Sequence, residues 1–152
     1  MRRGPLLSWP KPSARSGSLI RRGFEKSTGN LYDGGFCQDL DAELEKDSGR
    51  GPDDRSDLKA LLDACREPDL VQRWAKLPEL VDLKSFLTYM AIELMLGHWD
   101  GYCCNRNNYR LYFDPVTTKA HFIPHGMDQL FGDTDASVLD NPTAILALAV
   151  MR

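Results

Sequence analysis

The sequence predicts an α+β fold that is mainly helical and contains one β-hairpin. Between residues 56 and 96, apolar residues recur at three- and four-residue steps, which is typical of helices that bury one face. Between Tyr109 and Ile123, apolar and polar residues alternate, which is typical of strands. The turn that begins at Asp114-Pro115 divides this stretch into a hairpin. With 152 residues, the chain has the length of one domain or of one lobe of a larger domain.

The N-terminal third gives weaker signals. Residues 1–18 are rich in Pro, Ser, Gly and Arg without a periodic apolar pattern, so we expect a disordered or unrelated leader. Residues 19–36 contain short apolar pieces between glycines, which predicts loops around one or two short strands. Residues 36–46 are expected to form a short helix, and residues 47–55 a loop. The domain is therefore expected to cover residues 19–152.

Two helices are predicted next, each from a residue that is typical of a helix N-terminus. Ser56 is a good N-cap for a helix over residues 57–66, because its hydroxyl can accept a backbone N–H of the first turn. Pro68 is expected to open a second helix that ends near Leu77, since proline is tolerated at the first helical position.

The longest predicted helix begins after Asp82 and ends before Gly97, which suits the position after a helix C-terminus. Its apolar residues form one stripe that we expect to be buried: Leu83, Phe86, Leu87, Met90, Ala91 and Leu94. Residues 142–150 are expected to begin a final helix.

Composition excludes several classes of function. The net charge of −3 and the pI of about 5.6 argue against a nucleic-acid surface, which needs a basic face. No apolar run approaches the roughly 20 residues that span a bilayer, and residues 1–18 do not have the pattern of a secretory signal. The four cysteines show no metal-type spacing and leave the compartment open.

The residues with candidate chemistry follow the longest helix. Asp100 and Asn105 stand five residues apart, which is the spacing of a catalytic Asp and a metal-binding Asn in the loop used for phosphoryl transfer from ATP. Asp128 comes after the hairpin, in a loop flanked by Gly126 and Gly132. Because hairpin strands are antiparallel neighbours, we expect Asp128 to return beside the first loop.

A family resemblance rests on the same segment. The run His98-Trp99-Asp100, then Asn107-Asn108-Tyr109, then residues 122–128 with Pro124 and Asp128, resembles the CotH kinase family, which is named for a bacterial spore coat protein. The resemblance implies a protein-kinase-like fold, ATP with Mg²⁺ or Mn²⁺, and transfer to Ser or Thr of secreted or coat proteins.

By that resemblance, Asp100 is the catalytic Asp and Asp128 binds the metal. The amide ligand stays open, because kinase spacing favours Asn105 and the Asn-Tyr signature of the family favours Asn108. Asp133 and Asp135 are expected to form a solvated acidic loop rather than to extend the site.

The resemblance covers only the C-terminal lobe of such a fold. No glycine-rich lid and no strand with an ATP-binding Lys precede it, so we expect a protein-kinase-like C-lobe with the N-lobe absent, truncated at both ends. Two other functions therefore stay open: a non-catalytic binding or structural coat protein with the same fold, and a metal-dependent phosphoesterase that uses Asp100 and Asp128.

Overall fold

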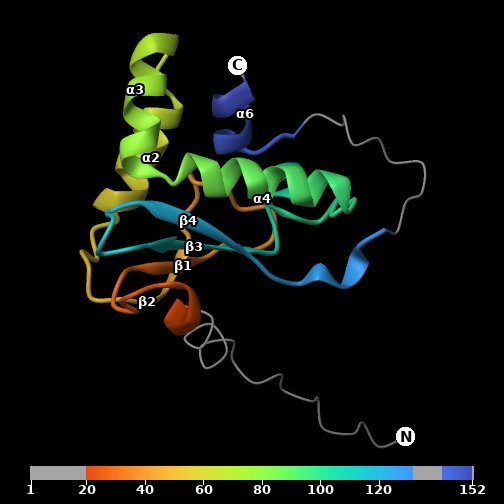
Figure 1. The fold of residues 1–152 in the computed structure, drawn as a ribbon, viewed down its shortest axis with the longest axis horizontal. Helices are drawn as coiled ribbons and strands as arrows, with labels where there is room; N and C mark the ends of the chain where they lie inside the picture. The colour runs from red at the N-terminus through yellow and green to blue at the C-terminus, as the bar shows by residue number, and fades with distance from the viewer. Residues whose placement is uncertain (1–19, 132–141, 152) are drawn as a thin grey trace, which may run out of the picture.

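The computed structural model describes residues 20–131 and 142–151, so the leader predicted over residues 1–18 lies outside the described residues. In chain order the elements are β1 (Leu31–Asp33), β2 (Glu45–Ser48), α2 (Ser56–Cys65), α3 (Leu70–Leu80), α4 (Leu83–Met95), α5 (Tyr102–Asn105), β3 (Tyr109–Phe113), β4 (Ala120–Pro124), the 3₁₀ helix η1 (Met127–Gln129) and α6 (Ile145–Met151). Figure 1 shows α4 lying along β4, with α2, α3 and α6 grouped beyond it. The prediction of an α+β fold is confirmed.

The strands form one antiparallel sheet in the order β2-β1-β3-β4. The predicted hairpin is confirmed as β3 and β4, in which Leu111 pairs with Phe122. Two further strands extend it. The short strand expected within residues 19–36 is β1, whereas β2 was missed, because all four of its residues are polar and show no apolar alternation.

The helix predicted over residues 36–46 is wrong, because these residues form turns that lead into β2. Leu40 and Leu44 are both buried, as one face of a helix would be. The Asp39 carboxylate, however, accepts the N–H groups of Leu40 at 2.7 Å and of Ile145 at 2.8 Å. A side chain that bonds nearby backbone in this way competes with helix formation.

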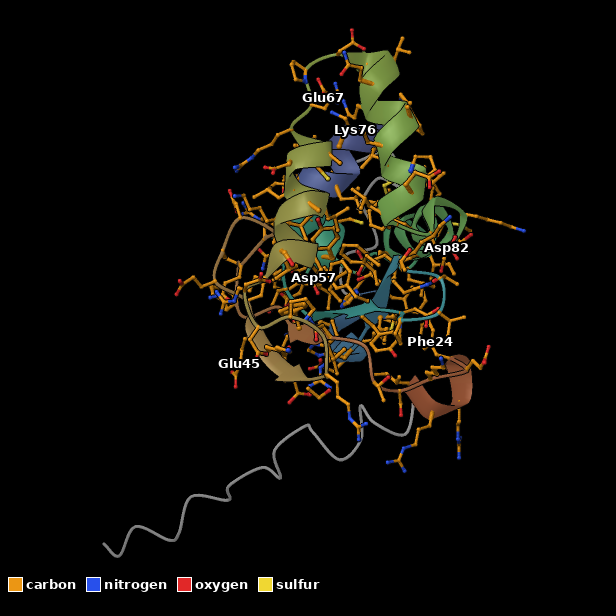
Figure 2. The ribbon with its side chains drawn as sticks, turned by 90° about the vertical axis from the view of Figure 1, so that its left-hand side faces the viewer. Phe24, Glu45, Asp57, Glu67, Lys76 and Asp82 are labelled. Carbon is orange, nitrogen blue, oxygen red and sulfur yellow. The ribbon has the colours of Figure 1, made fainter. Side chains whose placement is uncertain are left out.

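The predicted start of α2 is displaced by one residue. Arg55 occupies the N-cap with a φ of 57° and no side-chain cap hydrogen bond, and Ser56 is the first helical residue. Asp57 lies in the first turn of α2, next to the sheet (Figure 2). Its carboxylate accepts hydrogen bonds of 2.8 Å from both Asn30 Nδ2 and the Tyr32 hydroxyl. These bonds fix α2 on β1.

The start of α3 also differs from its prediction. Asp69 rather than Pro68 marks the boundary, because the Asp69 carboxylate accepts the Gln72 N–H at 2.8 Å. The helix then continues through Pro78 to Leu80, beyond the predicted end near Leu77.

The ends of α4 are confirmed, but its buried face is only partly as predicted. Asp82, labelled in Figure 2, accepts the Ser85 N–H at 3.0 Å, and Gly97 follows the helix with a φ of 60°. Phe86 is buried, whereas Leu87 is 40% exposed. The other buried positions of α4 are Tyr89 and Glu93 rather than members of the apolar stripe.

An aromatic cluster in the core joins α4 to α5 and to the hairpin. The Phe122 ring lies 4.9 Å from that of Phe86 and 4.5 Å from that of Tyr102, and the Tyr102 and Tyr109 rings are 4.6 Å apart. This packing fixes both ends of the chain segment that connects α4 to β3. Within the described residues, none of the helices combines the length and the apolar character needed to cross a bilayer.

Candidate functional site

The candidate site begins where α4 ends and the chain reverses toward β3. Gly97 adopts a left-handed conformation directly after the helix, and the short helix α5 follows Gly101. Arg106 and Asn108 then have φ values of 54° and 52°. These left-handed residues bend residues 97–108 into a compact loop, called the Asp100 loop below.

The Asp100 carboxylate is held by the side-chain amides of three asparagines of its own loop. Asn105 Nδ2 donates to Oδ1 at 2.7 Å, and Asn108 Nδ2 donates to Oδ2 at 2.8 Å. Asn107 Nδ2 bridges both oxygens at 3.1 Å. Both oxygens therefore have fixed positions, and the structure places Asn105 and Asn108 within hydrogen-bond distance of Asp100.

The same hydrogen bonds determine the charge of the site. Burial acts to raise the pKa of Asp100, but the amide hydrogen bonds from Asn105, Asn107 and Asn108, helped by the charge of the nearby His98, outweigh burial. The pKa of Asp100 consequently lies below its ordinary value, so the group is a carboxylate at neutral pH and can only accept hydrogen bonds.

The two asparagines that the sequence left as alternatives point their amide oxygens in different directions. Asn105 Oδ1 accepts a hydrogen bond from the Cys37 thiol at a distance of 3.6 Å. Asn108 Oδ1 instead faces Gly126, since a Cβ atom added to Gly126 would lie 2.3 Å from it. The His125 N–H also donates to the Asn108 carbonyl oxygen at 3.0 Å. Of these two asparagines, Asn108 is therefore the one whose amide oxygen faces the described part of the loop after the hairpin.

Asp128 lies on this second loop. Gly126 has a φ of 59° and turns the chain into η1, where Asp128 is exposed. Within the part of the chain that the structure describes, Asp128 makes no hydrogen bond to Asp100 or to the three asparagines. The hairpin thus brings the Asp128 loop against the Asp100 loop through Gly126 and Asn108, while the two carboxylates stay unbonded.

A charged cluster borders the second loop. Arg110 Nη2 lies 3.1 Å from Asp33 Oδ2, and His125 Nε2 lies 3.6 Å from Asp33 Oδ1. Burial acts to raise the pKa of Asp33, but His125 and Arg110 outweigh burial and lower it. The cluster ties the end of β1 to the residue that contacts Asn108.

The oxygen donors of the site are of the kind that Mg²⁺ and Mn²⁺ prefer, namely the Asn108 amide oxygen and the Asp128 carboxylate. Among the described residues, no group of three or more His, Cys, Asp or Glu side chains is arranged to hold a metal. Magnesium needs only one or two carboxylates when substrate phosphates complete its shell, so the residues present fit such an ion. Gly132, Asp133 and Asp135 lie outside the described residues.

Sequence reasoning missed two contributors to the Asp100 loop. Asn107 was not singled out from its neighbours, although it contacts both carboxylate oxygens. Glu93 was overlooked inside α4, although its side chain is 2% exposed and accepts hydrogen bonds from the loop. The signal for Glu93 was its position seven residues after the buried Phe86, on the same face of an apolar helix.

Comparisons with known proteins identify a family for this chain. The sequence profile of the family described as "CotH kinase protein" matches residues 14–146. The chain is also 36% identical to the invasin CotH2 of Rhizopus delemar over 59 residues, which are 38% of this chain and 10% of that protein. It is 34% identical to the invasin CotH3 of the same fungus over 59 residues, with the same two coverages. Because the family profile matches most of its length, the chain belongs to the CotH kinase protein family.

Proposed function

We propose that this chain supplies the acceptor-orienting and metal-binding part of an ATP-dependent protein kinase that phosphorylates Ser or Thr hydroxyls. Under this proposal the described fold corresponds to a protein-kinase-like C-lobe. The matched segment is about a tenth of each curated relative, so the chain covers a small part of those proteins.

The observation that supports this proposal best is the fixed carboxylate of Asp100. Phosphoryl transfer requires mainly positioning and charge, because the phosphoryl group moves through a loose transition state. An ionised carboxylate that is held by Asn105 and Asn107 can accept the hydrogen bond of an incoming hydroxyl and orient its oxygen. It takes the hydroxyl proton late, as the phosphoester bond forms and the bond to ADP breaks.

We assign the metal to Asn108 and Asp128 rather than to Asn105. The Asn108 amide oxygen faces Gly126, two residues before Asp128, whereas the Asn105 amide oxygen is occupied by the Cys37 thiol. A bound Mg²⁺ or Mn²⁺ would neutralise charge on the ATP phosphates. The family signature that includes Asn108 agrees with this choice.

A second candidate is a non-catalytic binding or structural protein with the same fold. It is favoured by the names of the relatives, which are called invasins, and by the hydrogen bonds of Asp100, whose two oxygens already accept three amide groups. In this case the asparagines stabilise the loop, and no hydroxyl approaches the carboxylate.

Incubation of the chain with γ-labelled ATP, Mn²⁺ and a Ser/Thr-rich acceptor protein tests the proposal. We expect label on protein hydroxyls, and we expect Asp100→Ala to abolish it while unfolding stability falls by only about 1 kcal/mol, since the freed amides reach water. Release of inorganic phosphate without labelled protein would indicate the phosphoesterase instead. Label that survives Asp100→Ala would contradict the assignment, and a failure of the natural chain to label protein or to bind Mg-ATP in calorimetry would favour the binding module.

A further inference from the structure

Glu93 is a buried acid whose hydrogen bonds go to the Asp100 loop. It lies on the inner face of α4 with 2% of its surface exposed. Its Oε1 accepts the Tyr102 N–H at 3.2 Å, and its Oε2 accepts the Cys103 N–H at 2.9 Å. The two carboxylate oxygens thus hold two consecutive backbone groups, which begin directly after Gly101.

The loop also approaches Glu93 from its other side. His98 Nδ1 lies 3.4 Å from Glu93 Oε1, and both side chains are almost completely buried. A Cβ atom added to Gly101 would lie 2.4 Å from Glu93 Oε1 and 2.7 Å from His98 Nδ1. Residue 101 therefore has to be glycine for the backbone to come this close to the acid.

The residues that contact Glu93 lie before and after Asp100 in the sequence. His98 precedes it by two residues, Gly101 follows it, and Tyr102 and Cys103 are the first two residues of α5, which ends at Asn105. A buried carboxylate costs several kcal/mol in desolvation unless hydrogen bonds offset that cost. An apolar residue would fill the core of α4 without this cost, but it would leave the Tyr102 and Cys103 N–H groups without an acceptor.

We propose that Glu93 is a positioning residue, which sets the place of Asp100 by binding the backbone that follows it and by contacting the His98 side chain that precedes it. It acts through the loop and touches no reacting atom. Its effect on catalysis rests on the phosphotransfer proposed above, but its effect on the loop does not. The loop and catalytic consequences can therefore be measured separately.

The first measurement concerns the loop and needs no activity. Backbone amide hydrogen exchange would be compared between the natural chain and Glu93→Gln. The matched control is Glu79→Gln, since Glu79 is an exposed residue of α3. Glutamine keeps the shape but has one acceptor oxygen in place of two. We expect at least about tenfold faster exchange at Tyr102 or Cys103, with the β3–β4 amides still protected and no change in the control.

The second measurement concerns the reaction. Misplacement of a reacting group by about 1 Å costs roughly 100-fold in rate. We expect Glu93→Gln to lower kcat by about 10- to 100-fold while KM for ATP changes less than about twofold, because the acid does not contact nucleotide. Glu93→Asp, which keeps both acceptors, is expected to recover part of kcat.

The outcomes separate the two proposals. Faster exchange at Tyr102 or Cys103 in a chain without transfer activity would support the positioning of the loop while contradicting the kinase. Unchanged exchange at both amides, or equal loss of protection throughout the hairpin, would overturn the inference for Glu93. If Glu93→Gln does not fold, the contact is tested in the natural chain by NMR scalar coupling across the hydrogen bond from the Cys103 N–H to the Glu93 carboxylate. Detection of this coupling would support the inference, and its absence would overturn it.

Discussion

Asp100 and its asparagines show how a single loop prepares one carboxylate. Three amide donors offset the burial that would otherwise raise the pKa of Asp100, so the group stays ionised and fixed. An acceptor that is already oriented loses no further freedom when a hydroxyl arrives. The absence of a Cβ atom at Gly126 in turn leaves room for the amide oxygen of Asn108.

Alanine substitutions at Gly97 and Gly126 separate the effect of the contact between Gly126 and Asn108 from the effect of backbone strain. Gly97 and Gly126 have φ values of 60° and 59°, but a Cβ atom meets nothing within 4 Å at Gly97 and meets Asn108 Oδ1 at Gly126. We expect both alanine variants to lose about 1 kcal/mol of unfolding stability from strain. Only Gly126→Ala should shift the Asn108 side-chain amide signal in NMR spectra. An equal shift in both variants, or in neither, would show that Gly126 does not position Asn108.

At the scale of the elements, α4 both packs the core and holds the Asp100 loop. Its start depends on Asp82, whose carboxylate accepts the Ser85 N–H, and its end depends on Gly97. Between these caps, Phe86 packs on Phe122, and Glu93 binds the loop. Stability of this helix is therefore tied to the geometry of the site.

The sequence predicted that Ser56 and Asp82 are both N-cap residues, whereas the structure shows this role only for Asp82 of these two. Substitutions at the two positions test this difference. Asp82→Ala should lower the free energy of unfolding by about 1 kcal/mol, because α4 loses its N-cap. Ser56→Ala should change it by less than about 0.5 kcal/mol, since Ser56 is the first residue of α2 and not its cap. Urea denaturation measures both. A larger loss from Ser56→Ala than from Asp82→Ala would restore the boundary that the sequence predicted.

Much of the arrangement of helices and strands was predictable from the sequence, and the exceptions have physical causes. The hairpin and the ends of α4 follow from alternation, a turn and two capping residues, which are all local signals. Residues 36–46 do not form the predicted helix, because Asp39 bonds the distant Ile145, which no local pattern reveals. The partners of the buried Glu93 could not be predicted either, since they lie in the next loop, although its position on the apolar face of α4 was a signal for the residue itself. The choice between Asn105 and Asn108 required the position of Gly126.

At the scale of the molecule, Asp39 joins three parts of the chain. Its carboxylate accepts hydrogen bonds from Leu40 N–H, from the Tyr102 hydroxyl at 3.1 Å and from Ile145 N–H at the start of α6. Burial raises the pKa of Asp39 in spite of these bonds. The acid therefore connects the segment before β2, the Asp100 loop and the last described helix.

This raised pKa predicts a pH dependence of stability. The folded chain binds the Asp39 proton more tightly than the unfolded chain, so this contribution is complete below the ordinary value of 3.8 and is lost as pH rises through the raised value. The free energy of unfolding of the natural chain relative to Asp39→Asn should therefore fall as pH increases above 3.8. Urea titrations across this range measure the difference. A difference that grows with pH would contradict the sign.

Under the proposed function, the loop after α4 and the loop after the hairpin meet at one divalent cation. Paramagnetic broadening by small amounts of Mn²⁺ with ATP tests this on the chain itself, because weak binding is sufficient. We predict that the Asn108 side-chain amide and the backbone amides of residues 126–128 broaden first, that Asn105 broadens less, and that Asp128→Asn removes the effect. Broadening that begins elsewhere, or that persists in Asp128→Asn, would contradict a metal site shared by the two loops.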